Sequence, residues 1–190
     1  MVRAIILDCF GVSVTDALTQ IIDDLRGSDP EKADEITRLS NEAGKGLIEP
    51  HPYRAAIADV LELSFDEYMN KLRSGEHKNH ELLSYIKTLR PQYKIGVLSN
   101  VSAGGLKLRF SEQELRQHFD TVVASGEIGY AKPEAQAYEI AASSLGVRLD
   151  ECVMVDDRQE YCDGAIGVGM QAILYIDNEQ LKTELKSIGS

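Results

Sequence analysis

The chain is short of several kinds of residue, and each shortage excludes a class of protein. It has three cysteines, an odd number in apolar surroundings, which predicts free buried thiols rather than a disulfide framework. No Cys-x-x-Cys pair occurs, which argues against a structural zinc site. Basic residues are also few, because 20 Lys and Arg stand against 31 Asp and Glu, for a net charge of -11. Such a protein repels nucleic-acid backbones and anionic membrane surfaces, so we expect neither as a partner.

Long apolar runs are missing as well. No stretch approaches the roughly 18 apolar residues of a membrane span, so no membrane segment is expected. Residues 1–8 are too short for a signal peptide and lead directly into a strand pattern. These absences predict a cytoplasmic protein. The 190 residues, 43% of them hydrophobic, suffice for one core domain with a small insert.

Strand-like and helix-like patterns alternate over most of the chain. Apolar runs of the kind found in buried parallel strands occupy residues 3–8, 94–98, 121–124, 152–155 and 171–176. Helical periodicity fills most of the intervals between them. This alternation predicts an α/β fold, a three-layer Rossmann-like parallel sheet.

Residues 15–76 differ, because they contain helical periodicity and no strand-like run. Ser28-Asp29-Pro30-Glu31 is typical of a helix start, and Ser64-Phe65-Asp66-Glu67 of a capping box. We therefore expect a small helical domain over 15–76, inserted into an α/β core domain over 1–14 and 77–190. Within it, His51-Pro52-Tyr53 is predicted to lie in a turn that faces the substrate, although an ordinary surface loop is the simpler interpretation.

Polar side chains follow three of the predicted strands. Asp8 follows the first, Ser99 and Asn100 follow the second, and an aspartate pair follows the run that ends at Val155. Ligands bind beyond the carboxyl ends of parallel strands, so we expect these residues to converge on one site. A carboxylate such as Asp8 can attack a phosphorus or carbon centre, although it can also simply cap a turn.

Two further features add charge to this site. The adjacent carboxylates of Asp156 and Asp157 repel each other unless a cation lies between them, and oxygen ligands favour Mg²⁺; capping of the next helix is the alternative. Lys132, in a loop before Pro133, could neutralise a phosphate, although a surface lysine is the simpler interpretation.

Taken together, four segments resemble the motifs of the haloacid dehalogenase (HAD) superfamily: Leu7-Asp8-Cys9-Phe10-Gly11, Leu98-Ser99-Asn100, Ala131-Lys132-Pro133 and Val155-Asp156-Asp157. The helical insert resembles the C1 cap of subfamily IA, and the whole chain is similar to sugar-phosphate phosphatases of that branch. The resemblance implies the following roles: Asp8 as nucleophile and metal ligand, the Phe10 carbonyl as a second ligand, Ser99 and Asn100 as phosphoryl-binding groups, Lys132 as the charge-neutralising lysine, and Asp156 and Asp157 as further Mg²⁺ ligands.

Two residues depart from the family pattern. Phe10 stands where most phosphatases of the family carry an acid/base aspartate, and a phenyl ring cannot transfer protons. Tyr161 stands where many relatives carry an asparagine that supports the metal site. Asp16, Glu49 and His51 are candidates to replace the missing acid/base group. An aromatic residue at position 10 also occurs in the true dehalogenases, which use an arginine to receive halide; Arg26, Arg38 and Arg54 are the candidates.

These observations predict a Mg²⁺-dependent phosphatase that acts on a small phosphorylated metabolite through an aspartyl-phosphate at Asp8. Without the acid/base aspartate, its activity should be weakened, or limited to acyl and aryl phosphates, whose leaving groups need no proton. A non-catalytic binding or regulatory protein on the same fold is one alternative. A metal-independent haloacid dehalogenase is another. Either a monomer or a homodimer is expected.

Overall fold

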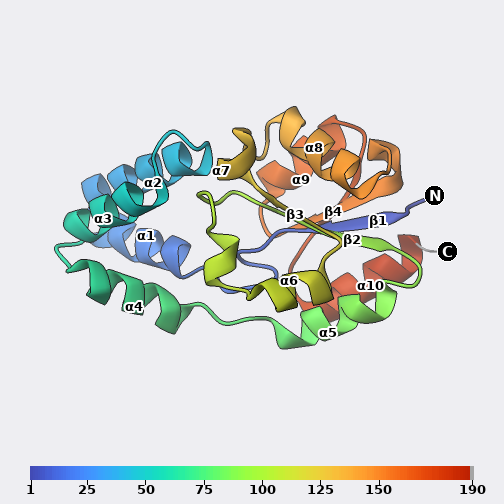
Figure 1. The fold of residues 1–190 in the computed structure, drawn as a ribbon, viewed down its shortest axis with the longest axis horizontal. Helices are drawn as coiled ribbons and strands as arrows, with labels where there is room; N and C mark the ends of the chain where they lie inside the picture. Colours follow the sequence, from blue (N-terminus) through green and yellow to red (C-terminus); the bar gives the residue numbers. More distant parts are fainter. Residues whose placement is uncertain (189–190) are drawn as a thin grey trace.

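A five-stranded parallel sheet forms the centre of the molecule in the computed structural model, which describes residues 1–188. Its order is β3-β2-β1-β4-β5 (Figure 1). The strands are β1 (Ala4–Leu7), β2 (Lys94–Ser99), β3 (Thr121–Ala124), β4 (Cys152–Asp156) and β5 (Gln171–Leu174). The predicted α/β fold with a parallel sheet is therefore confirmed.

Helices cover both faces of the sheet, which explains why the strands are apolar throughout. On one face lie α5 (His80–Leu89), α6 (Glu112–His118) and α10 (Asn178–Ile188); on the other lie α8 (Ala135–Leu145) and α9 (Gln159–Gly167) (Figure 1). Side chains of β1 alternate between the two layers: Ile5 and Leu7 join the first cluster, and Ala4 and Ile6 join the second. The three layers thus bury β1 and β4 on both sides along their whole length.

Four helices form a separate group beyond the carboxyl ends of the strands (Figure 1). We call this group the helical insert: α1 (Ala17–Ser28), α2 (Pro30–Gly44), α3 (Pro50–Val60) and α4 (Phe65–Gly75). It has its own apolar cluster, with Ile36, Ile57 and Tyr68 fully buried. Two of its helices start where the sequence predicts, because Asp29 caps α2 and the Ser64 capping box opens α4. No helix within residues 1–188 has the length and apolar character needed to cross a bilayer.

The insert joins the sheet through two segments that lie side by side. The Thr15 N–H donates to the His77 carbonyl at 3.0 Å, and the Thr15 hydroxyl donates to the Gly75 carbonyl at 2.6 Å. Val14 and Lys78 form an antiparallel bridge next to them. The chain therefore enters and leaves the insert at almost the same point.

The structure corrects some local predictions. His51, Pro52 and Tyr53 lie in the first turn of α3 rather than in a turn between helices, because Pro50 and Pro52 suit the first positions of a helix. Tyr53 is buried inside the insert, and its hydroxyl lies 3.2 Å from Ser40 Oγ, so it does not face a substrate. The four-residue helix α7 (Ser125–Ile128), directly after β3, was not predicted.

Candidate active site

Strand register brings Asp8 and Asp156 side by side. Leu7 pairs with Val155 in the sheet, and the Asp8 N–H donates to the Val155 carbonyl at 2.8 Å. The next residue of each strand is therefore an aspartate, on neighbouring parallel strands spaced about 4.8 Å apart. Asp156 is fully buried and Asp8 nearly so. Two buried carboxylates at this separation need a compensating positive charge.

Lys132 supplies that charge. Its Nζ lies 2.8 Å from Asp8 Oδ1 and 2.5 Å from Asp156 Oδ2, and its side chain is fully buried. Burial acts to lower the pKa of Lys132, but the attraction of both carboxylates outweighs it and raises the pKa, so the ammonium stays charged. Burial raises the pKa of Asp8 to about 7, against the opposing attraction of Lys132. The three groups form one electrostatic unit.

Asn100 and Tyr161 hold Lys132 in place. The Lys132 N–H donates to Asn100 Oδ1 at 2.8 Å, and Asn100 Nδ2 donates to the Lys132 carbonyl at 2.8 Å. The Tyr161 ring centre lies 4.9 Å from Lys132 Nζ, in cation–π contact. The side chain of Asn100 is thus turned toward the lysine backbone, which the sequence did not predict.

Asp157 completes a cluster of three carboxylates. One oxygen each of Asp8, Asp156 and Asp157 lies within 4.8 Å of the others, an arrangement that could hold a metal ion. Gly11 makes room for Asp157, because a Cβ added at Gly11 would lie 2.1 Å from Asp157 Oδ2. Gly11 also has a φ of +86°, which favours glycine. An all-oxygen donor set of this kind suits a hard divalent cation.

Two further acceptor or donor groups near this cluster lack partners. Ser99, at the carboxyl end of β2, is fully buried, and within residues 1–188 its Oγ has no hydrogen-bond partner. Buried hydroxyls are normally paired, so this one is available to a ligand. In the described part of the chain, no backbone donor bonds the Phe10 carbonyl, which leaves that oxygen available too.

The Phe10 ring is packed under an arginine that sequence reasoning missed. The Arg109 guanidinium carbon lies 5.1 Å from the centre of the Phe10 ring. Arg109 also bonds the Glu76 carboxylate and donates to the Gly105 carbonyl at 3.1 Å. No local sequence signal marks these residues, because Arg109 and Glu76 come from segments far apart in the chain.

The three candidates for a replacement acid/base group either contact other residues or are exposed to solvent. Asp16 caps α1 by accepting from the Thr19 N–H at 2.9 Å. His51 is exposed and stacks on Phe65 with ring centres 5.0 Å apart. Glu49 is exposed at the start of α3. Within residues 1–188, none of the three hydrogen-bonds to Asp8.

The three candidate arginines differ in position. Arg26 pairs with Asp23 and Arg38 pairs with Glu35 and Glu42, in each case on the outside of its own helix. Arg54 instead reaches the core, where its Nη2 lies 3.5 Å from Ser102 Oγ. Only Arg54 therefore points from the insert toward the loop after β2.

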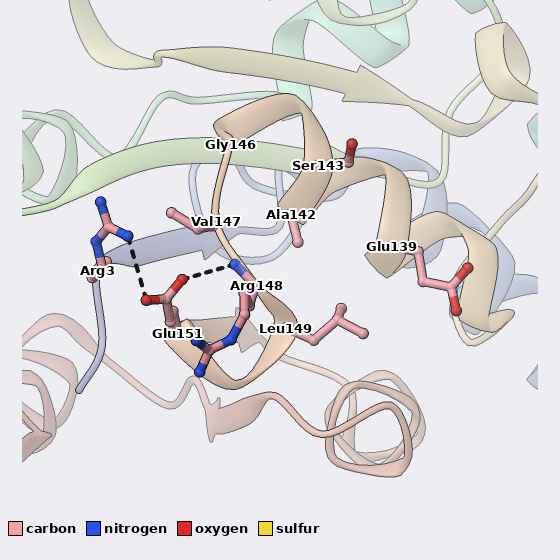
Figure 2. Close-up of a pocket in the computed structure, with 9 residues that line it drawn as sticks. All are labelled: Arg3, Glu139, Ala142, Ser143, Gly146, Val147, Arg148, Leu149 and Glu151. Atoms are coloured by element: carbon pink, nitrogen blue, oxygen red, sulfur yellow. Dashed lines mark hydrogen bonds and ion pairs between the residues drawn. The ribbon is translucent and has the colours of Figure 1, made fainter.

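An open surface depression lies at the other end of the sheet, near the amino ends of β1 and β4 (Figure 2). Its polar groups are bonded to one another: Arg3 pairs with Glu151 at 3.3 Å, and the Arg148 N–H donates to Glu151 at 2.9 Å. It holds none of the carboxylates described above. The convergence of charged groups at the carboxyl ends makes that edge the candidate active site.

Comparison with known proteins identifies the family of the chain. A family model described as haloacid dehalogenase-like hydrolase matches residues 2–169. A phosphatase of Mycobacterium tuberculosis is 35% identical over 105 residues, which are 51% of this chain and 47% of that protein. The glyceraldehyde 3-phosphate phosphatase of Methanothermobacter thermautotrophicus is 34% identical over 97 residues, covering 48% of this chain and 41% of that protein. The chain thus spans less than half the length of these two curated relatives.

The fold is shared with solved structures. A HAD family enzyme from Bacteroides thetaiotaomicron, solved in complex with magnesium and inorganic phosphate, aligns with a TM-score of 0.76 at 19% identity. The alignment covers 95% of this chain and 99% of that chain. At this level of identity the comparison establishes a common fold.

Proposed function

Because the chain belongs to the haloacid dehalogenase-like hydrolase family, we propose that it is a Mg²⁺-dependent phosphatase acting on a small phosphorylated metabolite. One observation carries the proposal: Lys132 lies between the Asp8 and Asp156 carboxylates, with Asp157 completing the cluster. The phosphatase names of two relatives, and the magnesium and phosphate bound to a structural neighbour, support the same chemistry.

In the proposed reaction, an Asp8 carboxylate oxygen attacks the phosphorus of the substrate and the bond to the leaving oxygen breaks. The Lys132 ammonium offsets the negative charge that gathers around the phosphoryl group, and Ser99 Oγ donates to one of its oxygens. Water then attacks the phosphorus of the aspartyl-phosphate, the bond to the Asp8 oxygen breaks, and inorganic phosphate leaves with the Asp8 carboxylate regenerated. Asp8, Asp156, Asp157 and the Phe10 carbonyl would hold Mg²⁺, whose positive charge stabilises the phosphoryl oxygens when bound.

Phe10 restricts this reaction, because its ring cannot protonate a leaving oxygen. General acid catalysis is typically worth about 10²–10⁴-fold in rate. We therefore propose that the enzyme favours acyl or aryl phosphates, whose leaving groups depart without a proton. The packing of Phe10 against Arg109 supports this restriction, since the ring is held in place by a cation–π contact.

We also propose that residues 15–76 act as a cap over this site and select the substrate. Its helices lie beyond the carboxyl ends of the strands and its two connections run side by side (Figure 1). A cap in this position can exclude water from the reacting groups.

Hydrolysis of 4-nitrophenyl phosphate, measured with Mg²⁺ and with a chelator, tests the proposal. We expect turnover that requires Mg²⁺ and is abolished in the Asp8→Asn variant. Turnover of 2-chloropropionate without metal would instead indicate a dehalogenase, which Phe10 also permits. Absence of both activities, together with retained ligand binding, would indicate a non-catalytic protein.

A further inference from the structure

Arg54, on α3 of the helical insert, carries a half-buried positive charge that no carboxylate of residues 1–188 neutralises. Three described arginines are half-buried: Arg54, Arg90 and Arg109. Arg90 pairs with Asp120, and Arg109 pairs with Glu76. Within residues 1–188, no carboxylate forms an ion pair with Arg54, whose one hydrogen bond goes to Ser102 Oγ. In a chain with a net charge of -11, such an isolated cation marks a place where an anion is expected.

Arg54 lies where the insert meets the loops that carry the reacting groups. Its partner Ser102 is buried and lies three residues after Ser99, at most about 11 Å along an extended chain. Arg109, whose positive charge acts on Arg54, contacts the ring of Phe10, two residues after Asp8. The guanidinium of Arg54 thus contacts the loop that follows β2, and its neighbour Arg109 contacts the loop that follows β1.

The local charge balance is positive. Glu76 neutralises Arg109, so one arginine charge is left over. Burial and the repulsion of Arg109 both lower the pKa of Arg54, as is expected of a guanidinium without a carboxylate partner. A bound anion would relieve this deficit.

The guanidinium group limits what that anion can be. Its planar fork of N–H donors matches the two oxygens of a carboxylate. Ser102 Oγ offers one more donor beside it. A phosphate dianion at this position would leave more of its oxygens without donors, so a carboxylate is the better match.

We propose that Arg54 and Ser102 bind a carboxylate on the leaving portion of the substrate, so that preferred substrates are phosphate monoesters that also carry a carboxylate. This inference rests on the proposed phosphatase function. It adds a subsite on the insert side of the site, separate from Lys132 and Ser99, which are proposed to bind the phosphoryl group.

A matched pair of substrates tests the subsite. 3-Carboxyphenyl phosphate and 3-carbamoylphenyl phosphate have nearly the same shape and differ in one negative charge. With the Mg²⁺-loaded protein, we expect kcat/KM to favour the carboxylate by about 10-fold or more, the size of a charge-assisted hydrogen bond. In Arg54→Gln this ratio should fall to about 1, and in Arg54→Lys to an intermediate value, because the charge remains and the fork is lost.

Arg38→Gln is the control, because Arg38 is another arginine of the insert but pairs on the outside of α2. It should keep the wild-type ratio. A wild-type ratio near 1 would overturn the proposal. So would an Arg54→Gln variant that loses activity on both substrates equally, since Arg54 would then position the insert rather than bind substrate.

Failure of the phosphatase function is distinguished by binding. If neither compound is hydrolysed, calorimetry of the same pair with the Asp8→Asn protein reads the subsite alone. If the 3-carboxyphenyl compound binds more tightly and this preference requires Arg54, the proposal of a carboxylate subsite stands and the proposal of phosphatase function is rejected. Equal binding of the two compounds would reject the subsite.

Discussion

Replacing Lys132 by methionine should destabilise the protein strongly and make its stability depend on metal. Lys132 is completely buried, and its two partner side chains are 9% and 0% exposed. Removing one partner of a buried ion pair costs about 3–5 kcal/mol, because an uncompensated charge remains. For a chain of 190 residues this corresponds to a fall in Tm of about 6–20 °C. Thermal unfolding at pH 8 in the presence of a chelator measures it.

Lys182 provides a matched control. Its Nζ also contacts two carboxylates, Glu81 at 2.7 Å and Glu179 at 2.6 Å, but these partners are 60% and 82% exposed. Exposed pairs contribute about 0–1 kcal/mol, so Lys182→Met should change Tm little. Equal effects of the two substitutions would refute the reasoning, because burial is what distinguishes them.

Metal and pH should both rescue the Lys132→Met protein. Mg²⁺ supplies a positive charge to the same carboxylates, so its addition should raise Tm more in the variant than in the wild type. Without the lysine, the pKa of Asp8 should rise further above its unfolded value, so the folded state binds more protons than the unfolded state above about pH 4. The variant's deficit should therefore shrink as the pH falls from 8 to 5. A deficit that is constant over pH, with no response to Mg²⁺, would contradict this account.

Three other predictions concern the same site. Gly11→Ala should weaken Mg²⁺ binding measured by calorimetry, because its Cβ would lie 2.1 Å from Asp157 Oδ2; Gly129→Ala, with a similar φ of +77° and open space around it, should lose about 1 kcal/mol of stability but keep Mg²⁺ affinity. Phe10→Asp should raise the ratio of alkyl to aryl phosphate turnover by about 10-fold or more, and an unchanged ratio would show that position 10 does not limit protonation. Mg²⁺ affinity of the wild type should fall as the pH drops below about 7, because burial raises the pKa of Asp8 to about 7 and the metal binds its ionised form; Asp8→Asn should reduce this dependence, and burial, which also raises the pKa of Asp157, should leave a remainder.

The sequence was sufficient to predict the parallel sheet and the gathering of residues at one edge. The apolar runs before Asp8, Ser99 and Asp156 predict strands, and parallel strands place their carboxyl ends together. Capping residues and a proline, as at Asp29-Pro30 and in the Ser64 capping box, also predicted two helix starts correctly. These signals are local, so they are readable without the fold.

Contacts between distant segments were not predictable in this way. Nothing in the sequence around Arg54 distinguishes it from Arg26 or Arg38, because its direction depends on how α3 lies against the core. The pairing of Arg109 with Glu76 beneath the insert is likewise set by tertiary packing. Side-chain amides are similarly ambiguous, as the contact of Asn100 with the Lys132 backbone illustrates.

The paired crossing at Thr15 and His77 has an evolutionary consequence. The segments that enter and leave the insert are hydrogen-bonded to each other there. An inserted domain therefore needs only to have its two ends close together. Replacing the helical insert by a helical bundle of different length or sequence would leave the register of β1 with β2 and β4 unchanged. Under the cap role proposed for residues 15–76, substrate recognition can therefore change while the residues at the carboxyl ends of the strands stay the same.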